Sequence, residues 1–196
     1  MNTVQNIENL VSEWLAAKEE DMDKFGDFYC STRDAFEGRL NKMLNELLAG
    51  KVASEDDAYI LSAIAGEIGN NSFDHNLGNW PDVPGIFFAY DFSKGIKIAL
   101  ADRGQGVLKT LKRVKPELKN DAEAIEVAFT EKISGRAPES RGNGLKFVKE
   151  SVESRKINLV FVSGNAQADL NEKMEIKKLE KGISGCLAII AAPQMQ

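Results

Sequence analysis

The sequence is poor in the residues that build disulfide scaffolds, metal centres and membrane spans. Its 2 cysteines, Cys30 and Cys186, lie far apart and outside any Cys-x-x-Cys or Cys/His pattern, so neither a disulfide framework nor a zinc site is indicated. No apolar run approaches the ~18 residues of a membrane span, and the first residues lack the basic segment of a signal peptide. We therefore expect a cytoplasmic protein without membrane contact.

Positive charge is also scarce. The 25 Lys and Arg residues are outnumbered by 30 Asp and Glu, which gives a formal net charge of −5 and argues against electrostatic attraction to nucleic acid or anionic lipid. One basic stretch stands out, with Lys109, Lys112, Arg113, Lys115 and Lys119. Because no aromatic residues are interleaved with these cations, the pattern favours a solvated helix face over a nucleic-acid site.

The overall composition is that of a folded domain. Apolar residues make up 43% of the 196 residues and only 5 prolines interrupt the chain, so at about 150 residues per domain we expect one domain with a small appendage. Apolar residues recur at steps of three and four over 4–15 and 36–48, and Gly50 ends the second pattern. We expect an N-terminal helical hairpin within 1–53. Its apolar stripes either pack on the rest of the chain or form a dimer or partner surface.

The rest of the chain, residues 54–196, combines helical and β patterns. A helix is expected from Ser54, with Asp57 in place for a capping box, to His75. Apolar segments around a short turn predict a β-hairpin, and later segments predict further strands beside a polar insert. The expected strands are 85–92, 95–101, 157–163, 174–178 and 185–191, and the further helices are 109–119, 121–130 and 145–155. This order of elements predicts the α+β class, as a two-layer α/β sandwich.

The first motif lies on the long helix expected from Ser54. Glu67 and Asn71 are four residues apart and therefore share one helical face. The Asn71 carbonyl oxygen suits a Mg²⁺ ion that already carries polyphosphate, and Glu67 could take a proton from a water or hydroxyl nucleophile. The same spacing occurs in many helices as a solvated polar face.

The second motif, Asp102-Arg-Gly-Gln-Gly106, directly follows an expected strand. An aspartate at a strand end can accept a hydrogen bond from an exocyclic amine, and Gly104 and Gly106 let the backbone approach a flat ligand closely. The same residues would also make an ordinary strand-to-helix turn with a capping aspartate.

The third motif, Gly142-Asn-Gly-Leu145, opens an expected helix after a long loop over 131–144. Free amides and the positive end of the helix dipole make such a turn an anion site, and loops of this length are typical of lids and binding loops. The motif matches neither the GxxxxGK[ST] phosphate loop nor the dinucleotide-binding fingerprint, which requires a preceding strand in a βαβ unit.

In this order the three motifs resemble those of the GHKL ATPase superfamily, which includes DNA gyrase, the heat-shock chaperone ATPases, histidine kinases and MutL. The resemblance covers about residues 54–192 and is nearest in layout to stand-alone anti-sigma-type kinase domains. It implies a histidine kinase-like ATP-binding domain over 54–196, with the two-layer sandwich known as the Bergerat fold.

The resemblance also implies roles for the motif residues. Glu67 would be the general base, Asn71 would bind Mg²⁺, and Asp102 would read the adenine. The other residues expected to bind the nucleotide are Gly104, Gly106, Gly142, Asn143, Gly144, Leu145 and Cys186.

Two positions depart from the family pattern. Lys146 stands where many histidine kinases have a further glycine, and Cys186 stands where the closing strand often has a threonine. Because a thiol is a poor hydrogen-bond donor, adenine selectivity would depend more heavily on Asp102. Phe129 matches the phenylalanine that anchors the lid in many members. His75, the only histidine, lies within the first motif's helix, so the chain lacks the separate phospho-accepting histidine of a self-phosphorylating kinase.

The sequence thus predicts a Mg²⁺- and ATP-binding protein that hydrolyses ATP slowly or transfers the γ-phosphate to a protein partner, as anti-sigma-type serine kinases do. One of the basic residues in or beside the loop could reach the terminal phosphate when the loop closes: Lys132, Arg136, Arg141 or Lys146. The alternatives are an ATP-gated interaction module without significant turnover and an α+β domain that binds no nucleotide. The presence of Glu67 favours an enzyme.

Overall fold

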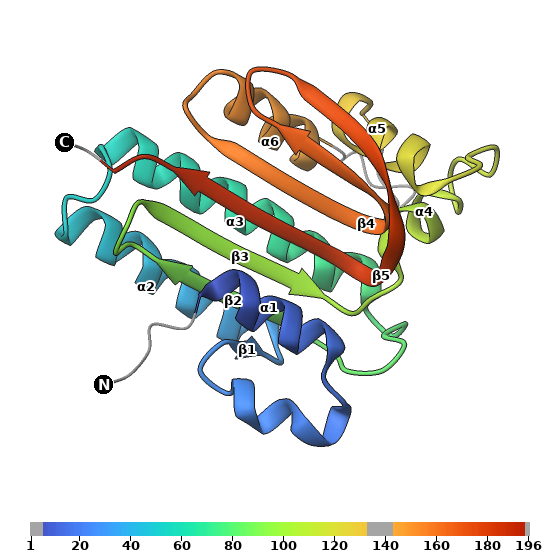
Figure 1. Ribbon diagram of the computed structural model, residues 1–196, viewed down its shortest axis with the longest axis horizontal. Helices are drawn as coiled ribbons and strands as arrows, with labels where there is room; N and C mark the ends of the chain where they lie inside the picture. The colour runs from blue at the N-terminus through green and yellow to red at the C-terminus, as the bar shows by residue number, and fades with distance from the viewer. Residues whose placement is uncertain (1–5, 133–142, 195–196) are drawn as a thin grey trace.

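The computed structural model describes residues 6–132 and 143–194, which form one antiparallel sheet with helices on both faces (Figure 1). The strand order in this part of the chain is β1-β2-β3-β5-β4. The strands are β1 (Tyr29–Cys30), β2 (Ile86–Asp91), β3 (Ile96–Asp102), β4 (Asn158–Leu170) and β5 (Met174–Ala192). The helices are α1 (Ile7–Ala16), the 3-10 helix η1 (Glu19–Phe25), α2 (Arg33–Ala49), α3 (Glu55–Asn76), α4 (Gly106–Leu111), α5 (Asp121–Thr130) and α6 (Gly144–Glu153). The predicted α+β class is confirmed.

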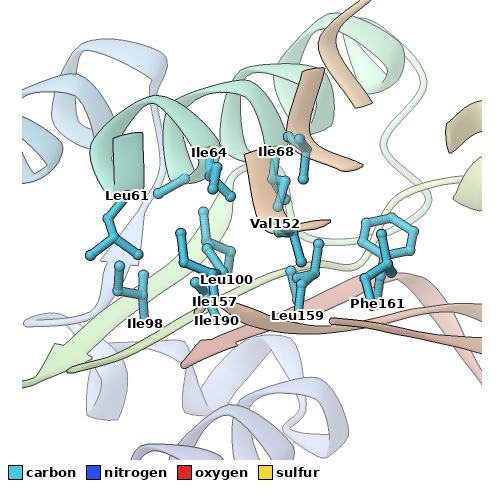
Figure 2. Close-up of a cluster of buried hydrophobic side chains, with 14 of the residues drawn as sticks. Leu61, Ile64, Ile68, Ile98, Leu100, Val152, Ile157, Leu159, Phe161 and Ile190 are labelled. Carbon is cyan, nitrogen blue, oxygen red and sulfur yellow. The ribbon is translucent and has the colours of Figure 1, made fainter. Parts of the chain in front are cut away.

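Helix α3 is the central helix of one sheet face. Ser54 is confirmed as its N-cap, because Ser54 Oγ accepts from the Asp57 amide at 3.1 Å and also donates to Asp57 Oδ2 at 2.7 Å. Along the helix, Leu61, Ile64 and Ile68 point at the sheet, where they meet apolar side chains of β3, β4 and β5 (Figure 2). This packing fixes the polar side of α3 relative to the strand ends.

Helix α6 packs against both α3 and α5, and α5 and α6 cover the β4–β5 half of the sheet (Figure 1). Val148 and Val152 of α6 are fully buried in the same apolar core as Ile64. Phe129, near the end of α5, is also fully buried, with its ring edge-on to that of Phe161 at a centroid distance of 5.2 Å. The chain before residue 131 and the start of α6 are therefore both anchored in the core.

The expected N-terminal helical hairpin is wrong, because α1 and α2 pack on opposite faces of the sheet. Successive strand residues point to opposite faces, so Phe87 of β2 meets α1 at Trp14, whereas Phe88 meets α2 at Phe36. The two-residue strand β1 joins the sheet edge between them and pairs with β2. Both apolar stripes are buried within the chain, and a dimer through these helices would have to use their other faces.

Two further boundaries differ from the sequence prediction. The basic helix expected over 109–119 ends at Leu111, and turns follow it up to Lys115. Pro116 prevents a helix from running on to 119, because it lacks an amide hydrogen and disfavours helical geometry at the residue before it. Strands β4 and β5 extend through the expected polar insert, with a register shift near Gly164. The strand character predicted over 174–178 is therefore part of a long hairpin.

The helices α3, α5 and α6 and the sheet form the expected two layers, and α1 adds a third over β2 and β3. None of the helices over 6–132 and 143–194 combines the length and apolar character needed to cross a membrane. Gly142 and the loop residues 133–142, including Arg136 and Arg141, lie outside the described residues, so the predictions made for them stay predictions.

Candidate functional site

Asp102 is the last residue of β3 and faces the C-terminal half of α3. Its side chain is almost completely buried, with the residue 2% exposed. Ser72 Oγ of α3 donates to Asp102 Oδ2 at 2.7 Å, and the Gly104 amide donates to Oδ1 at 2.8 Å. Burial raises the pKa of Asp102, while the bonds from Ser72, Gly104 and the Cys186 amide oppose that rise. The Asn76 side chain opposes the rise as well. A carboxylate has about four acceptor positions, so a further donor would share a position with one of these groups.

Asn76 connects the end of α3 to the loop of residues 103–105, called here the Asp102 loop. Its Nδ2 donates to the Ser72 carbonyl at 2.8 Å, and its Oδ1 accepts from the Gln105 amide at 2.8 Å. Gln105 Nε2 also donates to the His75 carbonyl at 3.2 Å. The Asn76 amide lies so close to Gly104 that a β-carbon there would overlap it. The glycine predicted for close approach to a ligand is thus also needed for close approach to α3.

The second glycine of the motif is held from the other side by β4. Gly106 has φ +74°, in the left-handed region that glycine tolerates best. The next amide, of Val107, donates to Ser163 Oγ at 2.9 Å, and Ser163 Oγ donates to the Gly185 carbonyl at 3.1 Å. This places Gly106 where β3, β4 and β5 meet.

Cys186 lies beside Asp102 in the sheet register; its role in binding a nucleotide stays a prediction. Burial raises the pKa of the Cys186 thiol well above its ordinary value, and the negative charge of Asp102 adds to the rise. The thiol is therefore protonated at neutral pH. Its sulfur lies 3.6 Å from Ser163 Oγ, within donor range for a thiol.

Glu67 and Asn71 face the start of α6, about 140° around α3 from the Ser72–Asn76 side. The Glu67 carboxylate lies against Gly144, where a β-carbon would overlap Glu67 Oε2 and stand 3.7 Å from Asn71 Nδ2. Asn143 precedes the helix without a side-chain cap in the described part of the chain. Leu145 packs against the main core. The first and third motifs therefore meet.

A metal ion held by protein alone has no support in the described residues, where no group of three or more His, Cys, Asp or Glu side chains could hold one. Asn71 does fit the role of a single protein ligand. Its side chain makes no hydrogen bond with any other residue in 6–132 and 143–194, so its carbonyl oxygen is available. A Mg²⁺ ion there would take its other ligands from phosphate and water.

Sequence reasoning missed Ser72, Asn76 and Ser163, which hold the Asp102 loop. Ser72 and Asn76 are four residues apart and so share one face of α3; this polar pair was the one available signal. A hollow of about 350 Å³ lies beside α4, lined by Gln105, Leu108, Lys109, Lys112 and Asp121. None of the predicted site residues lines this hollow.

Comparison of the chain with models of known protein families and with curated proteins finds no match.

Proposed function

We propose that this protein binds Mg²⁺ and ATP as a member of the GHKL class with a Bergerat fold, and hydrolyses ATP or transfers its γ-phosphate to a protein partner. One observation carries the proposal. A single stretch of α3, residues 67–76, contacts both the Asp102 loop and the start of α6, although these lie more than 25 residues away along the chain. Three motifs that are separate in the sequence are thereby neighbours in space.

The base would bind at the Asp102 side. The carboxylate would accept a hydrogen bond from the exocyclic amine of adenine, whereas guanine presents a carbonyl oxygen at that position. Two facing acceptors leave a buried polar group unpaired, which costs ~1–3 kcal/mol. We therefore expect ADP to bind roughly 5- to 150-fold more tightly than GDP.

The phosphates would bind where Glu67 and Asn71 face Gly144. The α6 N-terminus supplies backbone amides and the positive end of the helix dipole. When bound, Mg²⁺ would neutralise phosphate charge and polarise the terminal phosphoryl group. Asn71 would orient that metal through its free carbonyl oxygen, and the exposed Glu67 would accept the proton of the attacking water or hydroxyl.

The ATP-gated module without turnover remains the second candidate, and one contact favours it. The Glu67 carboxylate lies against Gly144, in the space that a phosphate at the helix start would use. Nucleotide binding would therefore displace Glu67, a change that a partner protein could sense without any chemistry. We propose the cytoplasm as the compartment, and the two free cysteines support it.

The decisive experiment is incubation with radiolabelled ATP and Mg²⁺, with and without co-purifying proteins, following free phosphate and labelled protein. Calorimetric titrations with ADP and GDP run beside it, and equal affinities would exclude the adenine assignment. A chelator should weaken ATP binding by the wild type, but not by Asn71→Ala, and should leave adenosine binding unchanged. Turnover identifies an enzyme, whereas binding that alters partner affinity without turnover identifies the module.

A further inference from the structure

Arg103, the residue after Asp102, contacts two separate parts of the chain, the C-terminal end of α1 and Asp82. Its side chain is only 13% exposed. Nη1 donates to the Ala17 carbonyl at 2.7 Å, Nη2 forms an ion pair with Asp82, and the guanidinium lies 6.0 Å from the centre of the Trp14 ring. A loop that holds Asp102 on one side therefore holds the end of α1 on the other.

The contact with Ala17 supplies what α1 lacks. Ala17 is the C-cap of α1, and the last carbonyls of a helix have no partner within it and carry the negative end of the dipole. No lysine, arginine or histidine occurs over residues 13–16. Arg103 provides both a donor and a positive charge at this end, so the docking of α1 depends on a residue of the loop.

A second ion pair between α1 and β3 offers an internal comparison. Lys97 Nζ lies 2.7 Å from Glu8 Oε1, at the start of the strand and six residues before Arg103. Lys97 attaches α1 to β3 and Arg103 attaches it to the loop directly after β3, so Lys97 is remote from the Asp102 loop. Comparing variants of these two residues therefore separates the effect of attaching α1 to the loop from the effect of attaching α1 to the sheet in general.

We propose that Arg103 is a positioning residue that couples the docking of α1 to the conformation of the Asp102 loop. A shift of the loop when nucleotide binds changes the contacts of Arg103 with α1, and release of α1 makes the loop more mobile. Such coupling is reciprocal, so α1 and a ligand at Asp102 each strengthen the binding of the other. The ligand half of this inference rests on the proposed function, whereas the coupling of α1 to the loop does not.

The coupling is tested first without nucleotide, by hydrogen exchange on wild type, Arg103→Ala and Lys97→Ala. Arg103→Ala should speed exchange both in α1 and at the Gly104 and Gln105 amides, which are bonded to Asp102 and Asn76. Lys97→Ala should speed exchange in α1 alone. The buried stretch 61–68 of α3 serves as the reference for global stability and should not change. Unchanged loop amides in Arg103→Ala would overturn the proposal.

The second arm is calorimetric titration with ADP of the same three proteins. Coupling energies of the usual size predict that Arg103→Ala lowers ADP affinity about fivefold or more, while Lys97→Ala lowers it less than about threefold, as for an exposed ion pair. Equal affinity in wild type and Arg103→Ala would overturn the ligand half and leave the proposed function intact. Wild type that binds no ADP, yet shows the loop exchange change, would overturn the proposed function and leave the coupling intact.

Discussion

The two sides of α3 hold their neighbours in different ways. On one side, Ser72 and Asn76 bind the Asp102 loop through side-chain hydrogen bonds of 2.7–2.8 Å. On the other side, Glu67 and Asn71 lie against Gly144, and no hydrogen bond joins them to the start of α6 within the described residues. The first side is fixed before any ligand arrives, whereas the second has unused polar groups.

This difference separates what the fold needs from what a ligand would need. Buried polar groups must be paired in the folded chain, so the residues around Asp102 contribute to stability whether or not a base is bound. Glu67 is exposed and Asn71 is half-buried, and neither side chain makes a hydrogen bond with another described residue, so both should contribute little to stability. Substitutions on the Asp102 side of α3 should therefore lower stability, whereas substitutions of Glu67 and Asn71 should lower activity and leave stability almost unchanged.

The largest effect is expected for Glu67→Gln, which keeps the size of the side chain and removes its basicity. A general base contributes on the order of 10²–10⁴-fold to the chemical step, so turnover should fall by that factor while ATP affinity changes little. The measurement is single-turnover ATP hydrolysis with the protein partner present. Glu150→Gln, on the exposed face of α6, is the matched control. Equal turnover in wild type and Glu67→Gln would contradict the assignment.

The next largest effect is expected for Asp102→Ala on the base side. Loss of the acceptor should weaken ADP binding roughly 5- to 150-fold, equivalent to ~1–3 kcal/mol, and should abolish the preference over GDP. Calorimetry measures both quantities. Asp91→Ala, at the opposite end of the β2–β3 pair, should leave them unchanged. A variant that still prefers ADP would mean that another group reads the base.

Two asparagines five residues apart on α3 test the same comparison through their effects on the free energy of unfolding. Asn76→Ala removes the side-chain acceptor of the half-buried Gln105 amide and a side-chain donor to the Ser72 carbonyl. It should lower the free energy of unfolding by ~1–3 kcal/mol. Asn71→Ala removes no described hydrogen bond and should change it by less than about 0.5 kcal/mol. Urea unfolding followed by circular dichroism compares the two. Equal destabilisation would show that both sides of α3 are structural.

The smallest expected effect is a pH dependence at Asp102. Its pKa is raised in the folded protein from the ordinary 3.8, mainly by burial, so the folded state favours the protonated form. That contribution is fully present below 3.8 and is lost as the pH rises through the raised pKa. The stability of wild type relative to Asp102→Asn should therefore fall as the pH rises from about 4 towards neutrality.

Asp169 provides a control of opposite sign. Burial raises its pKa, but hydrogen bonds from Lys177 and Gln167 outweigh that effect and leave the pKa lowered. The stability of wild type relative to Asp169→Asn should rise with pH, because ionisation is favoured by folding, and level off above the ordinary pKa. Urea titrations of the three proteins across this pH range measure both trends, and parallel trends would contradict the Asp102 assignment.

Local patterns predicted the elements whose signals are local. Ser54 and Asp57 marked the start of α3, and the turn after β2 marked the hairpin with β3. The pairing of β1 with β2 joins residues more than 50 positions apart and has no such signal. The apolar periodicity of the N-terminal segment predicted two helices. It could not predict that α1 and α2 pack on opposite faces of the sheet, because that depends on contacts with distant strand residues.

The residues of the candidate site likewise fall into those predicted from local motifs and those whose roles depend on packing. Asp102, Gly104 and Gly106 were predicted from a short motif, and the structure brings that motif against α3. The roles of Ser72 and Asn76 depend on the exact rotation of α3 on the sheet, which is set by the packing of Leu61, Ile64 and Ile68. A single sequence contains the polar pair but not its orientation.

The position of α1 on the outer face of the sheet also affects how the chain is made. The apolar side chains of α1, Ile7, Val11 and Trp14, are buried against β2, β3 and β5, and β5 ends at Ala192. At about 5–20 residues per second, synthesis reaches that strand roughly 10–35 s after α1 is complete. During that interval α1 has no finished surface to cover, so a helix made well before β5 reaches its final place only after that strand is made.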